Sequence, residues 1–279
     1  MKWNLVIDVA ECHNCGNCVV AAKDEHVGND FPGYSAPHPA QGAGVMRIER
    51  HVRGSGHLVD TAHVPRMCNH CDDAPCLKAG GGAVNKRDDG IVIIDPVKAR
   101  GRRDLVDSCP YGAIVWNEEQ QLPQAWIFDA HLLDGGWAQP RNVSVCPTRA
   151  IEAVKSTDEA MAQRVHDENL RVLQPDLKTK PRIYYRNLHR ADSCFIGGSL
   201  TVQVAGQTEC AAGAEVQLWR DGKSIVTVRS DAFGDFKFDN LPAGAGRHQV
   251  RAIHPTLGQA KCEAVLGADS LVLPTLQMA

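Results

Sequence analysis

Residues 12–18 read Cys-His-Asn-Cys-Gly-Asn-Cys, and residues 68–76 read Cys-Asn-His-Cys-Asp-Asp-Ala-Pro-Cys. The first stretch is a C-x2-C-x2-C run and the second is a C-x2-C-x4-C run. Two further cysteines, Cys109 and Cys146, are each followed by proline. Three closely spaced cysteines together with a remote Cys-Pro are typical of the ligands of a [4Fe–4S] cluster. Because the chain has this combination twice, we expect two such clusters.

A zinc site is the main alternative interpretation of these runs, because C-x2-C pairs commonly bind zinc. However, zinc sites seldom combine C-x2-C-x2-C with a remote Cys-Pro. Residues 109–114 and 146–151 are two copies of C-P-x-x-A-I, a short repeat that suggests a duplicated unit and favours a ferredoxin-like arrangement. The three remaining cysteines, Cys194, Cys210 and Cys262, share no spacing pattern and are expected to be structural thiols.

The chain has 279 residues, of which 43% are hydrophobic, and a formal net charge of −3. That length allows two domains. The weak charge gives no electrostatic case for a nucleic-acid partner or direct membrane contact, and no stretch approaches the roughly 20 apolar residues of a membrane span. The N-terminus lacks the apolar core of a secretory signal because Asp8 interrupts it. A cytoplasmic, reducing setting is therefore expected, in which thiols serve as ligands.

The first 194 residues are expected to form one domain around the cysteine runs. Within it, residues 28–66 are rich in glycine, proline and histidine and are expected to form a long irregular loop. Residues 156–173 are expected to be helical, because Ser156 and Glu159 have capping-box spacing before an amphipathic run.

Residues 174–194 contain proline and basic side chains and are expected to form either a partner-facing strap or a solvated linker. From Phe195 onward, segments such as 199–204 and 215–219 alternate apolar and polar residues between short turns, which favours an antiparallel sandwich. The sequence therefore predicts an α+β protein. A duplicated ferredoxin-like iron–sulfur domain over residues 1–194 precedes an all-β, transthyretin- or immunoglobulin-like sandwich over residues 195–279.

The chain resembles the four-cluster iron–sulfur subunits that accompany bis-pterin molybdenum or tungsten oxidoreductases of the dimethyl-sulfoxide-reductase family. All four cysteine runs of that family are recognisable here, and half of their ligand positions keep cysteine. Within the group, the chain is similar to the small subunits of pyrogallol–phloroglucinol transhydroxylases over nearly its whole length. The stretches that carry this similarity are 5–10, 90–96, 109–112, 116–119, 130–134 and 180–185, together with the β-rich C-terminal part.

The resemblance implies how the eight cysteines are shared between two clusters. In the family's nested pairing, the first quartet would be Cys12, Cys15, Cys18 and Cys146, and the second quartet would be Cys68, Cys71, Cys76 and Cys109. The opposite pairing, in which Cys109 joins the first triplet and Cys146 the second, has the same stoichiometry and stays open at this point.

The positions that would hold two further clusters contain no cysteine. One set comprises Ala22, Trp126, Asp129 and Asn142, and the other comprises Gly80, Ala99, Arg102 and Leu105. Complete loss of two sites is what cluster chemistry requires, because a partly ligated cluster is labile. The resemblance implies that transhydroxylase small subunits keep the cluster at the first of these sets, so the chain departs from them there.

The resemblance also implies a large catalytic subunit that holds molybdenum and two pterin guanine dinucleotides. Hydroxyl transfer or hydroxylation of polyhydroxylated aromatics would occur there, because this chain shows no nucleophile or acid–base pair of its own. The chain is therefore expected to be a non-catalytic subunit that transfers or stores electrons. Two alternatives stay open. The chain could be an electron relay for a resorcinol-hydroxylase-type enzyme, a respiratory reductase or a formate dehydrogenase, or its clusters could be purely structural.

Overall fold

The computed structural model describes residues 1–42 and 44–279. They divide into two compact units, each built from two stretches of sequence. The first unit is Met1–Arg50 with His63–Leu188, and the second unit is His51–Ala62 with His189–Ala279. The sequence placed the boundary after residue 194 and kept residues 51–62 in the first domain, whereas the structure ends the first unit at Leu188.

A three-stranded sheet joins the start and the end of the first unit. Strand β1 (Lys2–Asp8) pairs antiparallel with β8 (Ile151–Ser156) and parallel with β9 (Ile183–Arg186). Leu5, Val6 and Ile7 are all buried. A strand with partners on both edges and apolar side chains on both faces is well protected from water, so the N-terminus is firmly fixed in this unit.

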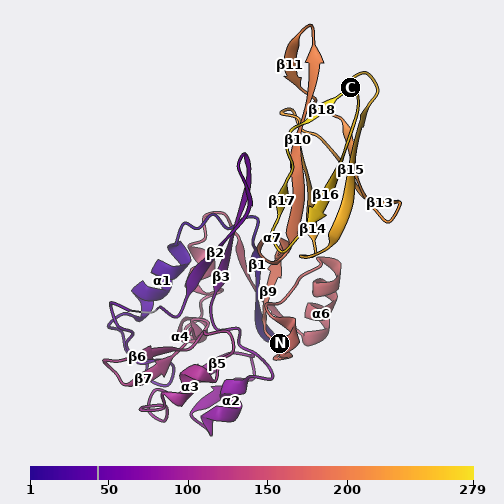
Figure 1. The fold of residues 1–279 in the computed structure, drawn as a ribbon. Helices are drawn as coiled ribbons and strands as arrows, with labels where there is room; N and C mark the ends of the chain where they lie inside the picture. The colour runs from indigo at the N-terminus through magenta and orange to yellow at the C-terminus, as the bar shows by residue number, and fades with distance from the viewer. Residues whose placement is uncertain (43) are drawn as a thin grey trace. The chain divides into compact units, whose positions relative to one another are not determined.

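The rest of the first unit consists of short helices and two-stranded ribbons (Figure 1). The helices are α1 (Asn17–His26), α2 (Pro75–Gly80), α3 (Asp104–Asp107), α4 (Ala130–Asp134), α5 (Arg141–Ser144), α6 (Asp158–Asp167) and the 3-10 turn η1 (Pro175–Leu177). The ribbons pair β4 (Val84–Lys86) with β5 (Val92–Ile94), and β6 (Val115–Asn117) with β7 (Leu122–Gln124). Because these elements are so short, loops carry most of the cysteines.

The helix expected over residues 156–173 is shorter than predicted and begins with a different cap. The Thr157 hydroxyl accepts the Ala160 N–H at 3.2 Å and caps α6. Ser156 is the last residue of β8 instead, and its hydroxyl accepts a hydrogen bond from Asn4 Nδ2 at 3.3 Å. Ser156 pairs with β1 as part of β8 and so cannot cap the helix, which is why α6 begins one residue later than the capping-box spacing predicts.

The prediction of an irregular loop over residues 28–66 is wrong for residues 47–66, which form a hairpin. Strand β2 (Arg47–Ser55) and strand β3 (Leu58–Arg66) are joined by a two-residue turn. Gly54 has a positive φ of 84°, and a Cβ there would lie 2.2 Å from the Leu58 carbonyl oxygen, so the hairpin requires glycine. The signal that sequence reasoning missed is the Gly-Ser-Gly stretch of residues 54–56 between two runs that contain β-branched residues.

Residues 51–62 belong to the second unit because a buried charge network holds them there. The largely buried Arg53 guanidinium donates hydrogen bonds to Asp239 at 2.9 Å and to Asp60. Asp60 also accepts a hydrogen bond from Arg190 at 2.5 Å. Burial alone would raise the pKa of Asp60, but the hydrogen bonds from Arg190 and Arg53 hold that pKa well below its usual range.

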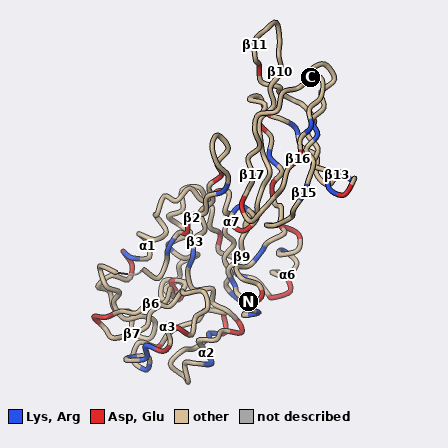
Figure 2. The backbone as a smooth tube through the Cα atoms, viewed as in Figure 1, with Lys and Arg blue, Asp and Glu red and all other residues tan. Residues whose placement is uncertain are grey.

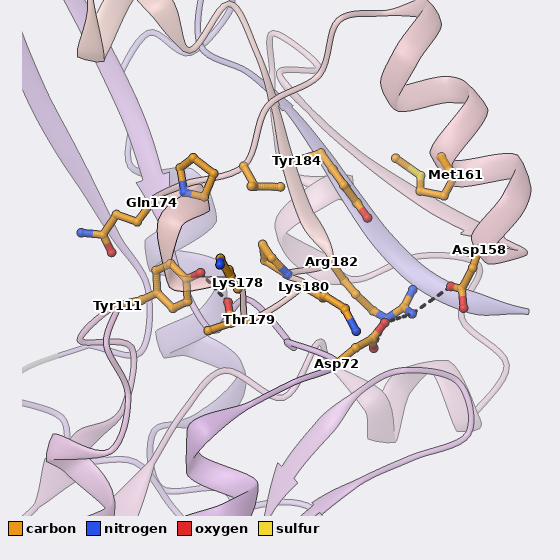
Figure 3. Close-up of a pocket in the computed structure, with 14 residues that line it drawn as sticks. Asp72, Tyr111, Asp158, Met161, Gln174, Lys178, Thr179, Lys180, Arg182 and Tyr184 are labelled. Carbon is orange, nitrogen blue, oxygen red and sulfur yellow. Dashed lines mark hydrogen bonds and ion pairs between the residues drawn. The ribbon is translucent and has the colours of Figure 1, made fainter.

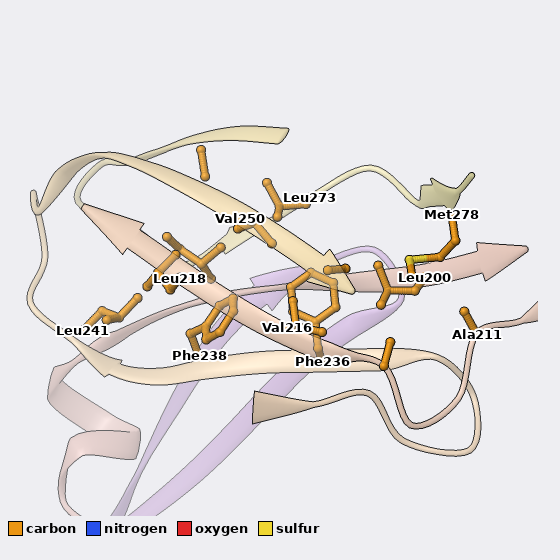
Figure 4. Close-up of a cluster of buried hydrophobic side chains, with 14 of the residues drawn as sticks. Leu200, Ala211, Val216, Leu218, Phe236, Phe238, Leu241, Val250, Leu273 and Met278 are labelled. Atoms are coloured by element: carbon orange, nitrogen blue, oxygen red, sulfur yellow. The ribbon is translucent and has the colours of Figure 1, made fainter. Parts of the chain in front are cut away.

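Two sheets make up most of the second unit, together with helix α7 (His189–Asp192). Its strands are β10 (Cys194–Val204), β11 (Gln207–Cys210), β12 (Glu215–Arg220), β13 (Lys223–Arg229), β14 (Asp235–Leu241), β15 (Gly246–His254), β16 (Gly258–Leu266), β17 (Leu271–Val272) and β18 (Leu276–Met278). One sheet has the order β11-β10-β14, with β17 and β18 also paired to β10, and the other has the order β13-β12-β15-β16. Leu200 and Phe238 of the first sheet share one buried core with Val216 and Val250 of the second (Figure 4).

Basic and acidic residues are interspersed along the backbone of both units (Figure 2). Among the described residues, every helix is too short or too polar to span a lipid bilayer.

Candidate metal centres

The second quartet of cysteines surrounds one cavity in the first unit. Cys68, Cys71, Cys76 and Cys109 all line it, and most of its other walls are apolar. The four thiols come from two loops and from the first turn of α2, where Pro75 occupies the start of the helix. Proline suits that position because its missing N–H would be unpaired there. The structure thus brings together, in one apolar chamber, four thiols that are separated by up to 41 positions in the sequence.

A strap, defined here as residues 174–182, fixes the loop that carries Cys71. Three backbone hydrogen bonds of 2.9 to 3.0 Å connect the two segments: Asp72 N to Lys180 O, Asp73 N to Thr179 O, and Arg182 N to Asn69 O. On the other side, the Lys86 ammonium donates hydrogen bonds to the carbonyl oxygens of His70 and Cys71 at 2.9 and 3.0 Å. The loop is therefore held from both sides.

Sequence reasoning missed Thr179 as a site residue. Its side chain is 3% exposed, its hydroxyl lies 2.6 Å from the Tyr111 hydroxyl, and it also hydrogen-bonds to the Cys71 thiol. The stretch Lys178-Thr179-Lys180 has the composition of an ordinary solvated linker. The sequence therefore contains no signal that Thr179 contacts Tyr111 and Cys71.

His70 is a buried neutral histidine in the wall of the same cavity. Burial lowers the pKa of His70 to about 3. Its Nδ1 accepts the Val92 N–H at 3.0 Å and lies 3.9 Å from Cys68 Sγ. The ring proton is therefore on Nε2, which has no hydrogen-bond partner among the described residues. The ring packs edge-on against Trp126 and Phe128.

The first quartet gathers at the N-terminus of α1. Burial and the neighbouring Cys12 thiol raise the pKa of Cys18 to about 11, and Cys15 and Cys146 contribute in the same direction. Burial also raises the pKa of Cys12, and the neighbouring Cys146 and Cys15 thiols raise it further. Four thiolates placed together would repel one another and lose hydration, so each quartet needs positive metal charge among its sulfurs to ionise fully.

A single metal ion and a [4Fe–4S] cube place different demands on the positions of four thiols. In residues 1–42 and 44–279, no three His, Cys, Asp or Glu side chains lie close enough together to hold one ion. Tetrahedral zinc would require each sulfur about 2.3 Å from a common centre. A [4Fe–4S] cube binds each thiolate to a different iron and accepts a wider ring of sulfurs.

The cysteine-free positions near the second quartet are filled by an apolar core. Ala99 and Leu105 are fully buried, and the cluster that contains them packs against Cys68, Cys76 and Cys109. A Cβ at Gly80 would lie 2.8 Å from the Val84 side chain, so no space remains there. Arg102 donates hydrogen bonds to Ala79 O at 2.9 Å and to Gly80 O at 3.4 Å.

The other cysteine-free set is filled by polar and aromatic side chains. Ala22, Trp126, Asp129 and Asn142 are at most 4% exposed. The Trp126 indole N–H donates to Asp129 Oδ1 at 3.2 Å, and the Arg141 backbone N–H donates to Asp129 Oδ2 at 2.8 Å. His26 Nε2 lies 3.7 Å from Asp129 Oδ1. A buried hydrogen-bonded network thus stands where the family pattern would place sulfur.

Comparison with known proteins identifies related sequences. The family model described as a 4Fe-4S dicluster domain matches residues 59–156. The pyrogallol hydroxytransferase small subunit of Pelobacter acidigallici is 44% identical over 246 residues, which cover 87% of this chain and 88% of that subunit. One subunit of the tetrathionate reductase of Salmonella typhimurium is 29% identical over 200 residues, or 70% of this chain and 75% of that one. The arsenate respiratory reductase iron-sulfur subunit ArrB of a Shewanella species is 31% identical over 141 residues, or 50% and 55% of the two chains.

Proposed function

The chain belongs to the family of iron–sulfur small subunits that includes the pyrogallol hydroxytransferase small subunit, and from that premise we propose that it carries two [4Fe–4S] clusters beside a catalytic large subunit. The family resemblance expected from the sequence is confirmed. The observation that carries the proposal is the cavity lined by the second quartet, because its four thiols converge in an apolar chamber.

The nested pairing of the cysteines is our proposal for the ligand sets. Cys109 lines the cavity of the second triplet, and Cys146 interacts electrostatically with Cys12 and Cys18 of the first. These neighbours support the nested pairing over the opposite one, in which Cys109 would have to leave its cavity. The filled positions of the two cysteine-free sets support a total of two clusters.

The partner in this proposal is a large subunit that binds molybdenum with two pterin guanine dinucleotides and contains the active site. The relative from Pelobacter acidigallici is named as part of a pyrogallol hydroxytransferase, which supports hydroxyl transfer or hydroxylation of polyhydroxylated aromatics as the reaction. This chain would transfer or store electrons beside that site. We place the complex in the cytoplasm, because eight thiolate ligands suit a reducing compartment.

A second candidate function is an electron relay in another molybdenum or tungsten oxidoreductase. The reductase subunits among the relatives favour it. Redox titration during turnover separates the two candidate functions, since a relay must change the oxidation state of its clusters in every cycle.

For the fold, we propose that the first unit is a duplicated ferredoxin-like domain. We propose that the second is a transthyretin- or immunoglobulin-like sandwich, supported by its two sheets with one shared core.

The test is metal analysis of the complex purified without oxygen. We expect about eight irons and eight acid-labile sulfides for each copy of this chain. The Cys109→Ser variant should lose about half of both, because its cluster would lack one of four thiolates.

The matched control is Cys194→Ser, since Cys194 is a buried thiol outside both quartets, and it should keep all its iron. A Cys109→Ser protein with the full iron content would exclude the proposed ligand set. An iron-free wild-type protein would exclude the proposed function.

A further inference from the structure

A second cavity of about 470 Å³ lies between the strap and helix α6 in the first unit. Figure 3 shows Tyr111 and Thr179 on one side of it, with Met161 and Asp158 of α6 across from them. Tyr184 of β9 also lines it. A volume of this size accommodates a small organic molecule.

Tyr111 and Thr179 lie where this cavity adjoins the chamber of the second quartet. Tyr111 lines both spaces, and its hydroxyl lies 2.6 Å from Thr179 Oγ1. Thr179 in turn hydrogen-bonds to the Cys71 thiol. When the Tyr111 O–H donates to Thr179, the threonine O–H is free to donate to Cys71 Sγ. A molecule in the cavity would therefore be connected to a cluster ligand by two hydroxyl groups.

The strap that walls the cavity has an unusual backbone. Gln174, Lys178 and Lys180 have positive φ angles of 47°, 54° and 51°, a conformation that is costly for residues other than glycine. The two left-handed residues on either side of Thr179 turn its side chain inward while both lysines stay exposed. Strained backbone of this kind persists where the surroundings hold it and gathers at functional sites.

The chemistry of the cavity points to an aromatic anion. Tyr184 and Met161 supply apolar surface. Arg182 is neutralised by Asp72 and by Asp158, whereas the Lys178 ammonium makes no ion pair or hydrogen bond within residues 1–42 and 44–279. One unpaired cation beside two phenol rings suits a planar molecule with a negatively charged substituent.

The cysteine-free sets explain why the second quartet would need such a site. Their positions are filled by buried side chains that lack sulfur. Electrons thus have no intermediate cluster to connect the two quartets. A carrier that binds beside the second quartet would give its cluster a route that does not depend on those positions.

We propose that the cavity binds a small anionic aromatic carrier of the quinone type, which exchanges electrons with the cluster of the second quartet. This inference rests on the proposed function, because it requires that cluster. Each reduced cluster gives up one electron and returns to its oxidised state. Each single transfer converts a quinone to a semiquinone, and two semiquinones then take up two protons from solvent and disproportionate to one quinone and one hydroquinone. The reverse reactions reduce the cluster.

The experiment uses the complete complex, reduced with dithionite, freed of excess reductant and mixed rapidly with anthraquinone-2,6-disulfonate. Reoxidation of the clusters is followed by their visible absorbance. For the wild type we expect a phase whose rate saturates with anthraquinone concentration, and this phase should vanish in Cys109→Ser. Lys178→Glu should raise the half-saturating concentration about tenfold or more, because it replaces an attraction with a repulsion. Met161→Trp should fill the cavity and abolish saturation.

The matched control is Lys223→Glu, which makes the same charge change at an exposed position of β13, and it should stay within about twofold of the wild type. A rate that rises linearly with concentration, with both cavity variants equal to the wild type, would overturn the inference while the clusters remain. Absence of the second cluster from the wild type, detected by iron analysis beforehand, would instead overturn the proposed function.

Discussion

Replacement of Trp126 tests whether a cysteine-free set has become part of the structural core. Trp126 is completely buried, stacks on Phe128 with ring centroids 4.9 Å apart, and donates its N–H to Asp129. Truncation of a buried aromatic residue to alanine costs about 3–5 kcal/mol. Trp126→Phe keeps most of the ring volume and loses one hydrogen bond, at a cost of about 1–2 kcal/mol. The smaller cost is expected because Asp129 keeps the Arg141 N–H as a donor.

The assay is thermal unfolding of the cluster-loaded protein without oxygen, at one fixed scan rate, because proteins with bound cofactors often unfold irreversibly. For a unit of this size, each kcal/mol corresponds to about 2–4 °C in Tm. Trp126→Ala should therefore lower Tm by roughly 6–20 °C, and Trp126→Phe by roughly 2–8 °C. Iron content should stay at about eight per chain in both variants.

The matched control is Trp137→Ala, because Trp137 is 48% exposed and exposed substitutions usually change stability by less than about 0.5 kcal/mol. If Trp126→Ala and Trp137→Ala unfolded within about 2 °C of each other, the indole would not be a packed core group.

Two further predictions concern the second unit. Because the pKa of Asp60 is held low by Arg190 despite burial, its stabilisation is complete above its unfolded pKa of about 3.9 and is lost as pH falls below that value. Asp60→Asn should thus lower Tm at pH 7 and down to about pH 4, and its difference from the wild type should shrink only as the pH falls below about 4; a difference that stays constant below pH 4 would refute the linkage. Gly54→Ala and Gly56→Ala both place alanine at positive φ, but only the first meets the Leu58 carbonyl. Gly54→Ala should therefore unfold at the lower temperature, and equal Tm values would contradict the close approach.

The cysteine runs could be found from the sequence because ligand spacing is a local property. The β-rich C-terminal part was recognisable for a similar reason, since alternating residues between turns identify strands one at a time. The boundary between the two units was not predictable in this way. It depends on Arg53 pairing with Asp239, and nothing near either residue in the sequence indicates a partner 186 positions away.

The contribution of the strap was also invisible in the sequence. Lys178-Thr179-Lys180 has the composition of a solvated linker, and only the tertiary hydrogen bonds to residues 72 and 73 give it a role. The Asp129 network shows the same limit. The sequence reveals that cysteine is absent from those positions, but the geometry is needed to show that Trp126 and Asp129 bind each other.

The place of β1 between β8 and β9 sets the order in which the protein can mature. Strand β1 is translated long before its partner β9 (Ile183–Arg186), so its sheet stays incomplete until β9 has been made. Until then β1 exposes a hydrophobic edge, which suits capture by a chaperone. The strap is translated just before β9, so the loop with Cys71 gains its hydrogen bonds to the strap only after residues 174–182 have been made. Under the proposed function, stable cluster binding in that chamber would therefore require the strap, and a nascent chain that stalls before the strap would hold its metal less firmly.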